Sequence, residues 1–313
     1  MKDSTVRQQF VFYAVIVIII LASFPLWAIK KPVGVLDTTL PGNTDLLYFA
    51  VDAPDTFIVY SPAKHANERI LTASERMSDM VISRDGRTVW TATKSGFVDR
   101  YELPPEGEST LAAGKEHSRI APVLSSIALS ANERFVAVGY GNSEDYNSRN
   151  VKILPAQSIL LEDEVADFAV SGDIQDIVAN PVRNLFYIIN SHSDRVRIYN
   201  ADRFRLEPDI IELGNSPGNF IVRPDGLRAF GAMNARNAIA VVDLETNETS
   251  DYIGVGFPPY AMAFNMEGTR LYVASRDSNA ISIMDTATNE IVKTFMLPPR
   301  APGLLPHAPS VRR

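Results

Sequence analysis

Three aspartates stand at the starts of predicted strands and are the residues of this chain best suited to chemistry. They are Asp79, Asp173 and Asp176. Their carboxylate oxygens are the ligands that Ca²⁺ prefers, and a hydrolytic Zn²⁺ site can use them too. If these strand starts converge around a central channel, the three carboxylates could hold a metal ion near its mouth. The competing interpretation is that they cap turns through side-chain oxygens, as aspartate commonly does.

The histidines lack the spacing of a metal or haem site. They fall in an outer hairpin, an insertion, a turn and the C-terminal tail: His65, His117, His192 and His307. Axial ligation needs imidazoles that converge from neighbouring elements. The 313 residues include no cysteine, which excludes disulfides, thiolate metal sites, iron–sulfur clusters and cysteine nucleophiles. No nucleophile elbow, phosphate-binding glycine loop or H-E-x-x-H motif occurs. The sequence therefore does not predict an enzyme.

The charge distribution argues against nucleic-acid binding. The chain has 30 Lys and Arg against 37 Asp and Glu, a net charge of −7. Residues 32–299 alone hold 23 basic and 36 acidic residues. Such a body repels phosphate backbones and anionic lipid headgroups, because affinity for both comes from Lys and Arg.

Residues 10–29 predict a transmembrane signal anchor behind a short tail, residues 1–9. Phe10 to Trp27 are 18 residues without a charge, and a helix of that length would span roughly 27 Å of a ~30 Å hydrocarbon core. A cleaved signal peptide is the alternative. Two basic residues precede the segment and two follow it, so the positive-inside rule does not decide the orientation. The anchor predicts a single-pass membrane protein. The absence of cysteine, together with the kind of repeat described below, favours a body outside the cytoplasm, in the periplasm or on the cell surface.

The body, residues 32–299, consists of repeats, and residues 300–313 read as a disordered Pro-rich tail. Residues 236–248 (RNAIAVVDLETNE) match residues 278–290 (SNAISIMDTATNE) at an offset of 42. Aromatic residues spaced 42, 45, 51, 44 and 42 positions apart mark six units: Tyr48, Trp90, Phe135, Phe186, Phe230 and Tyr272.

Each unit has the pattern of four short strands. In the clearest unit the expected strands are residues 260–264, 270–275, 280–285 and 291–296. Four strands in every ~40–45 residues are typical of a β-propeller blade. The sequence thus predicts an all-β fold, a β-propeller with six blades or with seven. Asp85-Gly86 and Asp225-Gly226 are expected in the turns between first and second strands, where glycine supplies a positive φ.

Short motifs recur in the last two units. The fifth unit has Gly214 followed by Pro217, then Pro224-Asp225-Gly226, and the sixth has Gly256 followed by Pro259, then Leu271-Tyr272-Val273-Ala274 and Asp285. These motifs resemble the YVTN β-propeller repeat of bacterial and archaeal envelope proteins. The resemblance is strong over residues 211–298 and fades in the third and fourth units. It implies a propeller in the cell envelope, commonly of seven blades.

The repeat also weighs against the metal site. The positions that match the three aspartates in other units are Ser126, Asn219 and Ala261, none of which is a carboxylate. We therefore expect no cofactor, with a Ca²⁺ or Zn²⁺ site on Asp79, Asp173 and Asp176 as the alternative.

The loops from second to third strands, together with the connections between units, emerge at one face of a propeller. Tyr and Arg are enriched at protein interfaces, and this face is predicted to carry them along with acidic residues. The expected partner-binding residues are Glu144, Asp145, Tyr146, Arg149, Arg236, Phe257, Tyr260 and Arg276.

Taken together, these features predict a membrane-tethered propeller that binds a protein partner or a membrane complex as a scaffold subunit. The alternatives are a metal-dependent hydrolase or lactonase of the envelope, and a carrier or maturation subunit for a redox cofactor.

Overall fold

The computed structural model describes residues 47–51, 56–61, 66–72, 77–102, 116–142, 145–170, 172, 174–190, 193–215, 217–265, 267–275, 278 and 280–296. Within these residues no helix has the length and apolar character needed to cross a bilayer. The predicted membrane anchor at residues 10–29 and the tails at 1–9 and 300–313 lie outside them.

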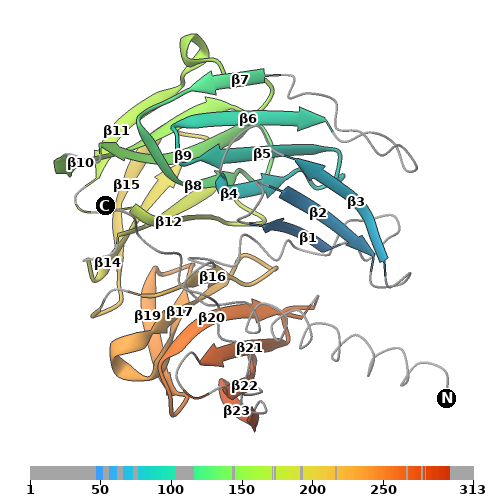
Figure 1. The fold of residues 1–313 in the computed structure, drawn as a ribbon. Helices are drawn as coiled ribbons and strands as arrows, with labels where there is room; N and C mark the ends of the chain where they lie inside the picture. Colours follow the sequence, from blue (N-terminus) through green and yellow to red (C-terminus); the bar gives the residue numbers. More distant parts are fainter. Residues whose placement is uncertain are drawn as a thin grey trace, which may run out of the picture.

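The described chain is all-β, and its strands form antiparallel sheets in chain order (Figure 1). Sheet A has three strands: β1 (Leu47–Val51), β2 (Thr56–Ser61) and β3 (Ala66–Thr72). Sheet B has four: β4 (Met77–Ile82), β5 (Thr88–Thr93), β6 (Phe97–Glu102) and β7 (Glu116–Arg119). Sheet C has four: β8 (Val123–Leu129), β9 (Phe135–Asn142), β10 (Asp145–Pro155) and β11 (Ala166–Val170).

Sheets D to F repeat this four-stranded pattern. Sheet D contains β12 (Ile174–Ala179), β13 (Leu185–Asn190), β14 (Arg195–Asn200) and β15 (Arg205–Glu212). Sheet E contains β16 (Phe220–Val222), β17 (Arg228–Met233), β18 (Ala238–Asp243) and β19 (Glu248–Gly254). Sheet F contains β20 (Pro259–Phe264), β21 (Arg270–Ser275), β22 (Ala280–Asp285) and β23 (Glu290–Met296). Two short 3₁₀ turns, η1 (Leu161–Asp163) and η2 (Asn234–Arg236), lie in connections.

The predicted all-β class and the repeat are confirmed. In sheets B to F the marker aromatic lies on the second strand, at Trp90, Phe135, Phe186, Phe230 and Tyr272. The strands expected in the sixth unit match β20 to β23 within one residue. Gly86 and Gly226 occupy the predicted turns with φ of 71° and 72°.

Two local predictions are wrong. His117 was expected in an insertion but lies on β7, paired with Asp99 of β6. Asp145, Tyr146 and Arg149 were expected in a loop but lie on β10, which pairs with β9 and shifts register between Asp145 and Arg149. A β-bulge accommodates extra residues within a strand. Residues that the sequence suggested as part of a long loop therefore belong to the strand.

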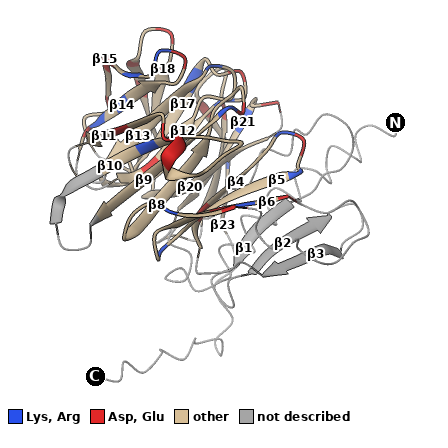
Figure 2. Cartoon of the chain, turned by 90° about the horizontal axis from the view of Figure 1, so that it is seen from above, with Lys and Arg blue, Asp and Glu red and all other residues tan. Residues whose placement is uncertain are grey.

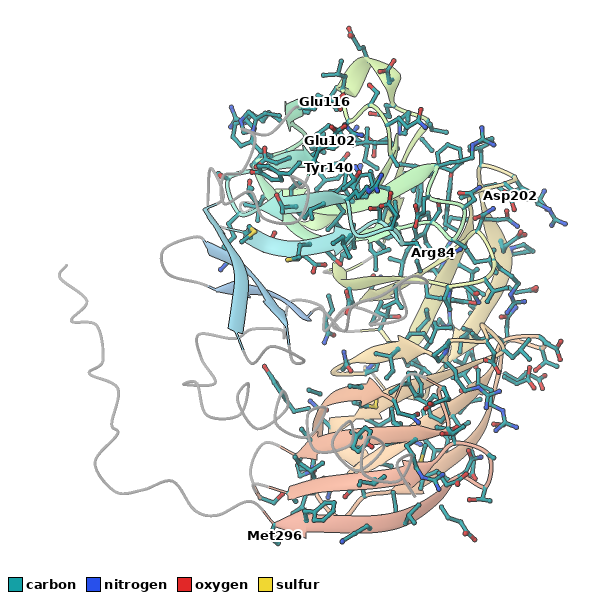
Figure 3. All side chains as sticks on the ribbon, turned by 90° about the vertical axis from the view of Figure 1, so that its right-hand side faces the viewer. Arg84, Glu102, Glu116, Tyr140, Asp202 and Met296 are labelled. Atoms are coloured by element: carbon teal, nitrogen blue, oxygen red, sulfur yellow. The ribbon has the colours of Figure 1, made fainter. Side chains whose placement is uncertain are left out.

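Apolar side chains join each of sheets B to F to the next. Residues that alternate along a strand point to opposite faces, so Val136 packs toward sheet B with Trp90, whereas Phe135 packs toward sheet D with Phe186. Similar clusters join D to E and E to F. Figure 3 shows the sheets following one another around an arc. Charged residues gather mainly at the ends of the strands (Figure 2).

Antiparallel order places the connections at two opposite ends of the sheets. We call the end with the second-to-third-strand connections and the links between sheets the η2 end. The end with the first-to-second and third-to-fourth connections is the η1 end. Equivalent turns bond across sheets at the η1 end: Asn132 N–H donates to Asn184 Oδ1 (2.9 Å), and Asn180 Nδ2 donates to Gly226 O (2.9 Å).

Gly96 shows how closely the β5–β6 turn approaches the connection from sheet B to sheet C at the η2 end. It lies in the turn between β5 and β6 with φ of 94°, and its carbonyl accepts the N–H of Ile120 (2.8 Å). A Cβ at this position would stand 1.5 Å from Ala121 O.

Replacing Gly96 with alanine should therefore destabilise the fold strongly. Gly96→Ala adds backbone strain and a clash with main-chain atoms, and we expect the free energy of unfolding to fall by at least about 3 kcal/mol. Gly254→Ala is the matched control, because a Cβ there meets nothing within 4 Å, and it should change stability by less than about 1 kcal/mol. Urea unfolding measures both, and similar losses for the two variants would contradict the described packing.

Candidate functional site

The first strands of four sheets share a β-bulge that fixes the direction of one polar position. In β4, β8, β12 and β20 the pairing with the second strand skips one residue: Ser78, Ser125, Gln175 and Tyr260. The residues that follow are therefore structurally equivalent: Asp79, Ser126, Asp176 and Ala261. This equivalence confirms the sequence match of Ser126 and Ala261 to the aspartates. Asn219 precedes β16, which begins at Phe220.

Asp79, Ser126 and Asp176 form a hydrogen-bonded row across sheets B, C and D. Ser126 Oγ lies 2.9 Å from Asp79 Oδ2 and 3.0 Å from Asp176 Oδ1. Asp79 Oδ2 also accepts the N–H of Ile127 (3.0 Å), and Ser126 Oγ accepts the N–H of Ile177 (3.1 Å). Ser126 is fully buried, Asp79 is 9 % exposed and Asp176 is half-buried, so the row is buried at sheets B and C and partly open at sheet D.

This geometry gives the aspartates a role in joining sheets. A hydroxyl has a single proton, so Ser126 donates to one of the two carboxylates at a time. Asp79 already accepts hydrogen bonds at both oxygens, since its Oδ1 receives the N–H of Met80 (2.9 Å). Asp173 lies outside the described residues. In the described part of the chain, no three His, Asp or Glu side chains converge as a metal site would require.

The η2 end of sheet E carries an arginine held over an aromatic ring. Arg236, in η2, places its guanidinium carbon 4.8 Å from the centroid of the Tyr252 ring, and its Nη2 donates to Gly214 O (3.2 Å). Tyr252 Oη donates to Leu213 O (2.8 Å). Asn237 ends η2 in the left-handed conformation, with φ of 52°. These contacts fix the guanidinium while the residue remains exposed.

Phe257 is a second exposed aromatic residue, in a segment whose backbone bonds beside η2. It lies in the connection from β19 to β20, and Val255 N–H of the same connection donates to Asn237 O beside η2 (2.9 Å). Phe257 and Tyr252 are each 39 % exposed. We call Arg236, Tyr252 and Phe257 the Arg236 surface. An exposed arginine with two partly exposed aromatics has the composition of a protein-binding hot spot.

The other residues predicted to bind a partner have different outcomes. Tyr260 is the bulged residue of β20 and is half-buried. Glu144 and Arg276 lie outside the described residues. For Asp145, Tyr146 and Arg149 the structure describes the strand and not the side chains. Tyr252 was missed because an aromatic residue in a strand is usually part of the core, and the sequence does not show that β19 is an edge strand.

His117 belongs to a polar cluster that the sequence did not indicate. Its Nδ1 bonds to Asp99 Oδ1, and Tyr101 Oη donates to Asp99 Oδ2 (2.9 Å). Phe97 stacks on the imidazole, with ring centroids 4.2 Å apart. A carboxylate that orients an imidazole is half of a general-base arrangement. Among the described hydrogen bonds, no Ser or Thr hydroxyl reaches the ring, so no nucleophile completes it there. Only the pairing of β6 with β7 brings these residues together.

Lys152 is the centre of a second cluster, on sheet C. Its Nζ donates to Glu164 Oε2 and to Asp167 Oδ2 (2.9 Å), and Tyr140 Oη donates to Asp167 Oδ2 (2.7 Å). Burial and the neighbouring Asp167 raise the pKa of Tyr140 to about 12. Burial lowers the pKa of Lys152, but the bonds to Glu164 and Asp167 outweigh it and raise that pKa. Burial raises the pKa of Asp167, but the bonds from Lys152 and Tyr140 outweigh it and lower that pKa. A raised pKa keeps the amine protonated at neutral pH, and a protonated amine is not a nucleophile.

Removing the hydroxyl of Ser126 should loosen the contact among three sheets. Ser126→Ala leaves the N–H of Ile177 and one oxygen of each aspartate without this partner, and we expect stability to fall by about 2 kcal/mol. Ser125→Ala is the control, because that hydroxyl donates to Gly139 O within sheet C (3.2 Å) and its loss should cost about 1 kcal/mol or less. Urea unfolding distinguishes them. An equal loss in both variants would mean that the row does not join the sheets.

Removing Lys152 should destabilise the protein in a pH-dependent way. Lys152→Met leaves the carboxylates of Glu164 and Asp167 without their cation, at a cost of about 3 kcal/mol at pH 7. The pKa of Asp167 is lowered in the folded state. Its contribution to the free energy of unfolding is therefore present above the pKa of the unfolded state and is lost as pH falls through the folded-state pKa. The difference between variant and wild type should therefore shrink as pH falls below the ordinary aspartate pKa of about 3.9. Lys293→Met, at an exposed lysine, is the control. A difference that stays constant from acid to neutral pH would contradict the cluster.

Comparisons with known proteins support the fold and no more. No protein-family model matches the chain, and no curated protein matches it. Among solved structures, the chain is similar to one titled as a functionally unknown protein from Desulfotomaculum acetoxidans DSM 771, with a TM-score of 0.64 and 16% sequence identity. The similarity covers 77% of each chain, so it extends over most of the sheets described above.

Proposed function

We propose that this protein is a β-propeller of the YVTN-repeat type that binds a protein partner in the cell envelope. The segment at residues 10–29 tethers it to the membrane, and its sheets lie outside the cytoplasm as a scaffold subunit. The observation that carries the proposal is the Arg236 surface, an exposed arginine held by an aromatic ring beside a second exposed aromatic residue.

Three features support the propeller interpretation. Sheets B to F have the same four-stranded meander order, each of them packs on the next through apolar faces, and the sheets follow an arc in Figure 3. A blade cannot cover both of its faces alone, and stacking around an axis is the propeller solution. The motifs at residues 214–226 and 256–285 carry the YVTN resemblance.

The state of the Arg236 surface supports binding. Its guanidinium is fixed by Tyr252 and Gly214 O, so little side-chain entropy is lost when a partner packs against it. Gly214 has φ of 66°, and a Cβ there would approach Arg236 Nη2 to 3.0 Å. By contrast, Asp79, on the first strand of sheet B, accepts hydrogen bonds at both carboxylate oxygens. The Arg236 surface is therefore better prepared to bind a ligand than the row of Asp79, Ser126 and Asp176.

Substitutions in the Arg236 surface should reduce partner binding. Arg236→Gln and Phe257→Ser remove the charge and the exposed ring, and we expect each to weaken binding about tenfold or more, as at interface hot spots. The measurement is the yield of chains that co-purify stoichiometrically with full-length protein from native membranes in mild detergent, determined by mass spectrometry.

Val292→Ser is the control, since Val292 is 56 % exposed on β23 and lies away from η2. It should leave the yield unchanged. Equal yields from the Arg236→Gln, Phe257→Ser and wild-type proteins would contradict binding through this surface. A protein without partners but with stoichiometric metal would favour the hydrolase alternative.

A further inference from the structure

The η1 end carries most of the exposed large apolar side chains. Nine such residues are exposed in the described part of the chain, and five of them lie in turns at this end. They are Leu160 (40 %) and Leu161 (43 %) of sheet C, Val182 (61 %) and Phe204 (49 %) of sheet D, and Leu227 (44 %) of sheet E. Single exposed apolar residues are ordinary, but a group on one face indicates an interaction site.

Contacts link the neighbouring turns that carry these residues, and Asn184 Nδ2 in the turn of Val182 donates to Asp202 Oδ1 in the turn of Phe204 (2.8 Å). Ala156 N–H, close to Leu160 in the chain, donates to Arg134 O (2.8 Å). The next residue, Phe135, meets the ring of Phe204 edge-on at 5.4 Å. A Cβ on Gly226 would stand 3.1 Å from Val182 Cβ, so Val182 lies directly beside the turn that carries Leu227. We call the five apolar residues the η1 patch.

The connection that presents Leu160 and Leu161 is held at several points. Trp90 Nε1 donates to Ala156 O (2.9 Å), and Ile159 N–H donates to Glu116 Oε2 (3.1 Å). Ile159 is fully buried in the core between sheets B and C. Lys152 binds Glu164 at the far side of η1. The two leucines are therefore presented on a fixed turn, which lowers the entropy cost of binding.

The charge around the η1 patch is acidic at one side. Glu162 and Asp163 follow the leucines and are exposed, and η1 stands out as an acidic segment in Figure 2. Arg203 and Arg205 flank Phe204 at the other side and are exposed, each within 3.6 Å of Glu207, whereas two further arginines of this end are bonded to backbone carbonyls. Arg183 Nη2 donates to Gly226 O (2.9 Å) and Leu244 O (3.0 Å), and Arg84 Nη2 donates to Ala131 O and Pro181 O (3.2 Å each). A complementary partner is apolar with a basic edge.

We propose that the η1 patch is a second docking surface, which binds an apolar protein segment bordered by Lys or Arg. Leu160 and Leu161 insert into the partner, Phe204, Val182 and Leu227 extend the apolar contact, and Glu162 and Asp163 face its basic residues. The surface lies at the end of the sheets opposite to the Arg236 surface and does not depend on it. A protein with both surfaces bridges two partners.

A pair of designed peptides tests the chemistry of this surface. The probes are an amphipathic helical peptide of Leu and Lys and its Leu and Glu counterpart, each titrated with full-length protein by fluorescence anisotropy. We expect the Leu/Lys peptide to bind and the Leu/Glu peptide to bind at least about tenfold more weakly. Added salt should weaken the first interaction.

Variants locate the binding. Leu160→Ser with Leu161→Ser changes no charge and should weaken the Leu/Lys peptide about tenfold. Glu162→Gln with Asp163→Asn should remove most of the salt dependence. Leu227→Ser is a second apolar variant in case the double variant unfolds. Phe257→Ser, at the opposite end, should bind like wild type, which separates this proposal from the Arg236 surface.

Three results would overturn the proposal. The first is no binding of either peptide at millimolar concentration. The second is unchanged affinity in both the leucine double variant and Leu227→Ser. The third is binding to vesicles of zwitterionic lipid that the leucine double variant abolishes, because the η1 patch would then contact a membrane surface.

Discussion

The structure depends on one constraint: a four-stranded sheet with two apolar faces cannot exist alone in water. Val136 and Phe135 are adjacent on β9 and pack against different sheets, so sheet C needs a neighbour on each side. Sheets D and E likewise pack on a neighbour at each side. In the described residues, burial takes up most of the second and third strands, and exposed residues lie mainly on the fourth strands and at the two ends of the sheets.

Much of the fold could be predicted because each repeat unit has the same strand pattern, so a clear pattern in one unit supports the assignment of the others. Sheets C and D lack the glycine turn motif, yet they form complete sheets, since alternating apolar strands carry more information than turns do. Contacts set by tertiary geometry could not be predicted. Nothing in the sequence places His117 opposite Asp99, exposes Tyr252 on an edge strand, or turns Ser126 toward two aspartates through a bulge.

The candidate sites differ in how far their polar groups are already satisfied. The row of Asp79, Ser126 and Asp176 joins three sheets and uses its hydrogen-bonding capacity for that purpose. Lys152 likewise serves to hold a connection. Arg236 and the leucines of η1 are different, because each is fixed by the protein yet presents its outer surface to solvent. Fixed and exposed groups are the ones that gain most from a partner.

Hydrogen–deuterium exchange on the protein isolated with its partners, compared with the protein alone, tests the central claim. The claim is that the two ends of the sheets bind partners and that the first strands support the fold. We expect protection in residues 233–237 and 250–258 at the η2 end, with the further surface adding residues 157–164 and 201–204. Exchange in residues 77–81, 124–128 and 174–178 should not change. Protection confined to those inner segments would contradict the account, because it would place the ligand at the row of aspartates.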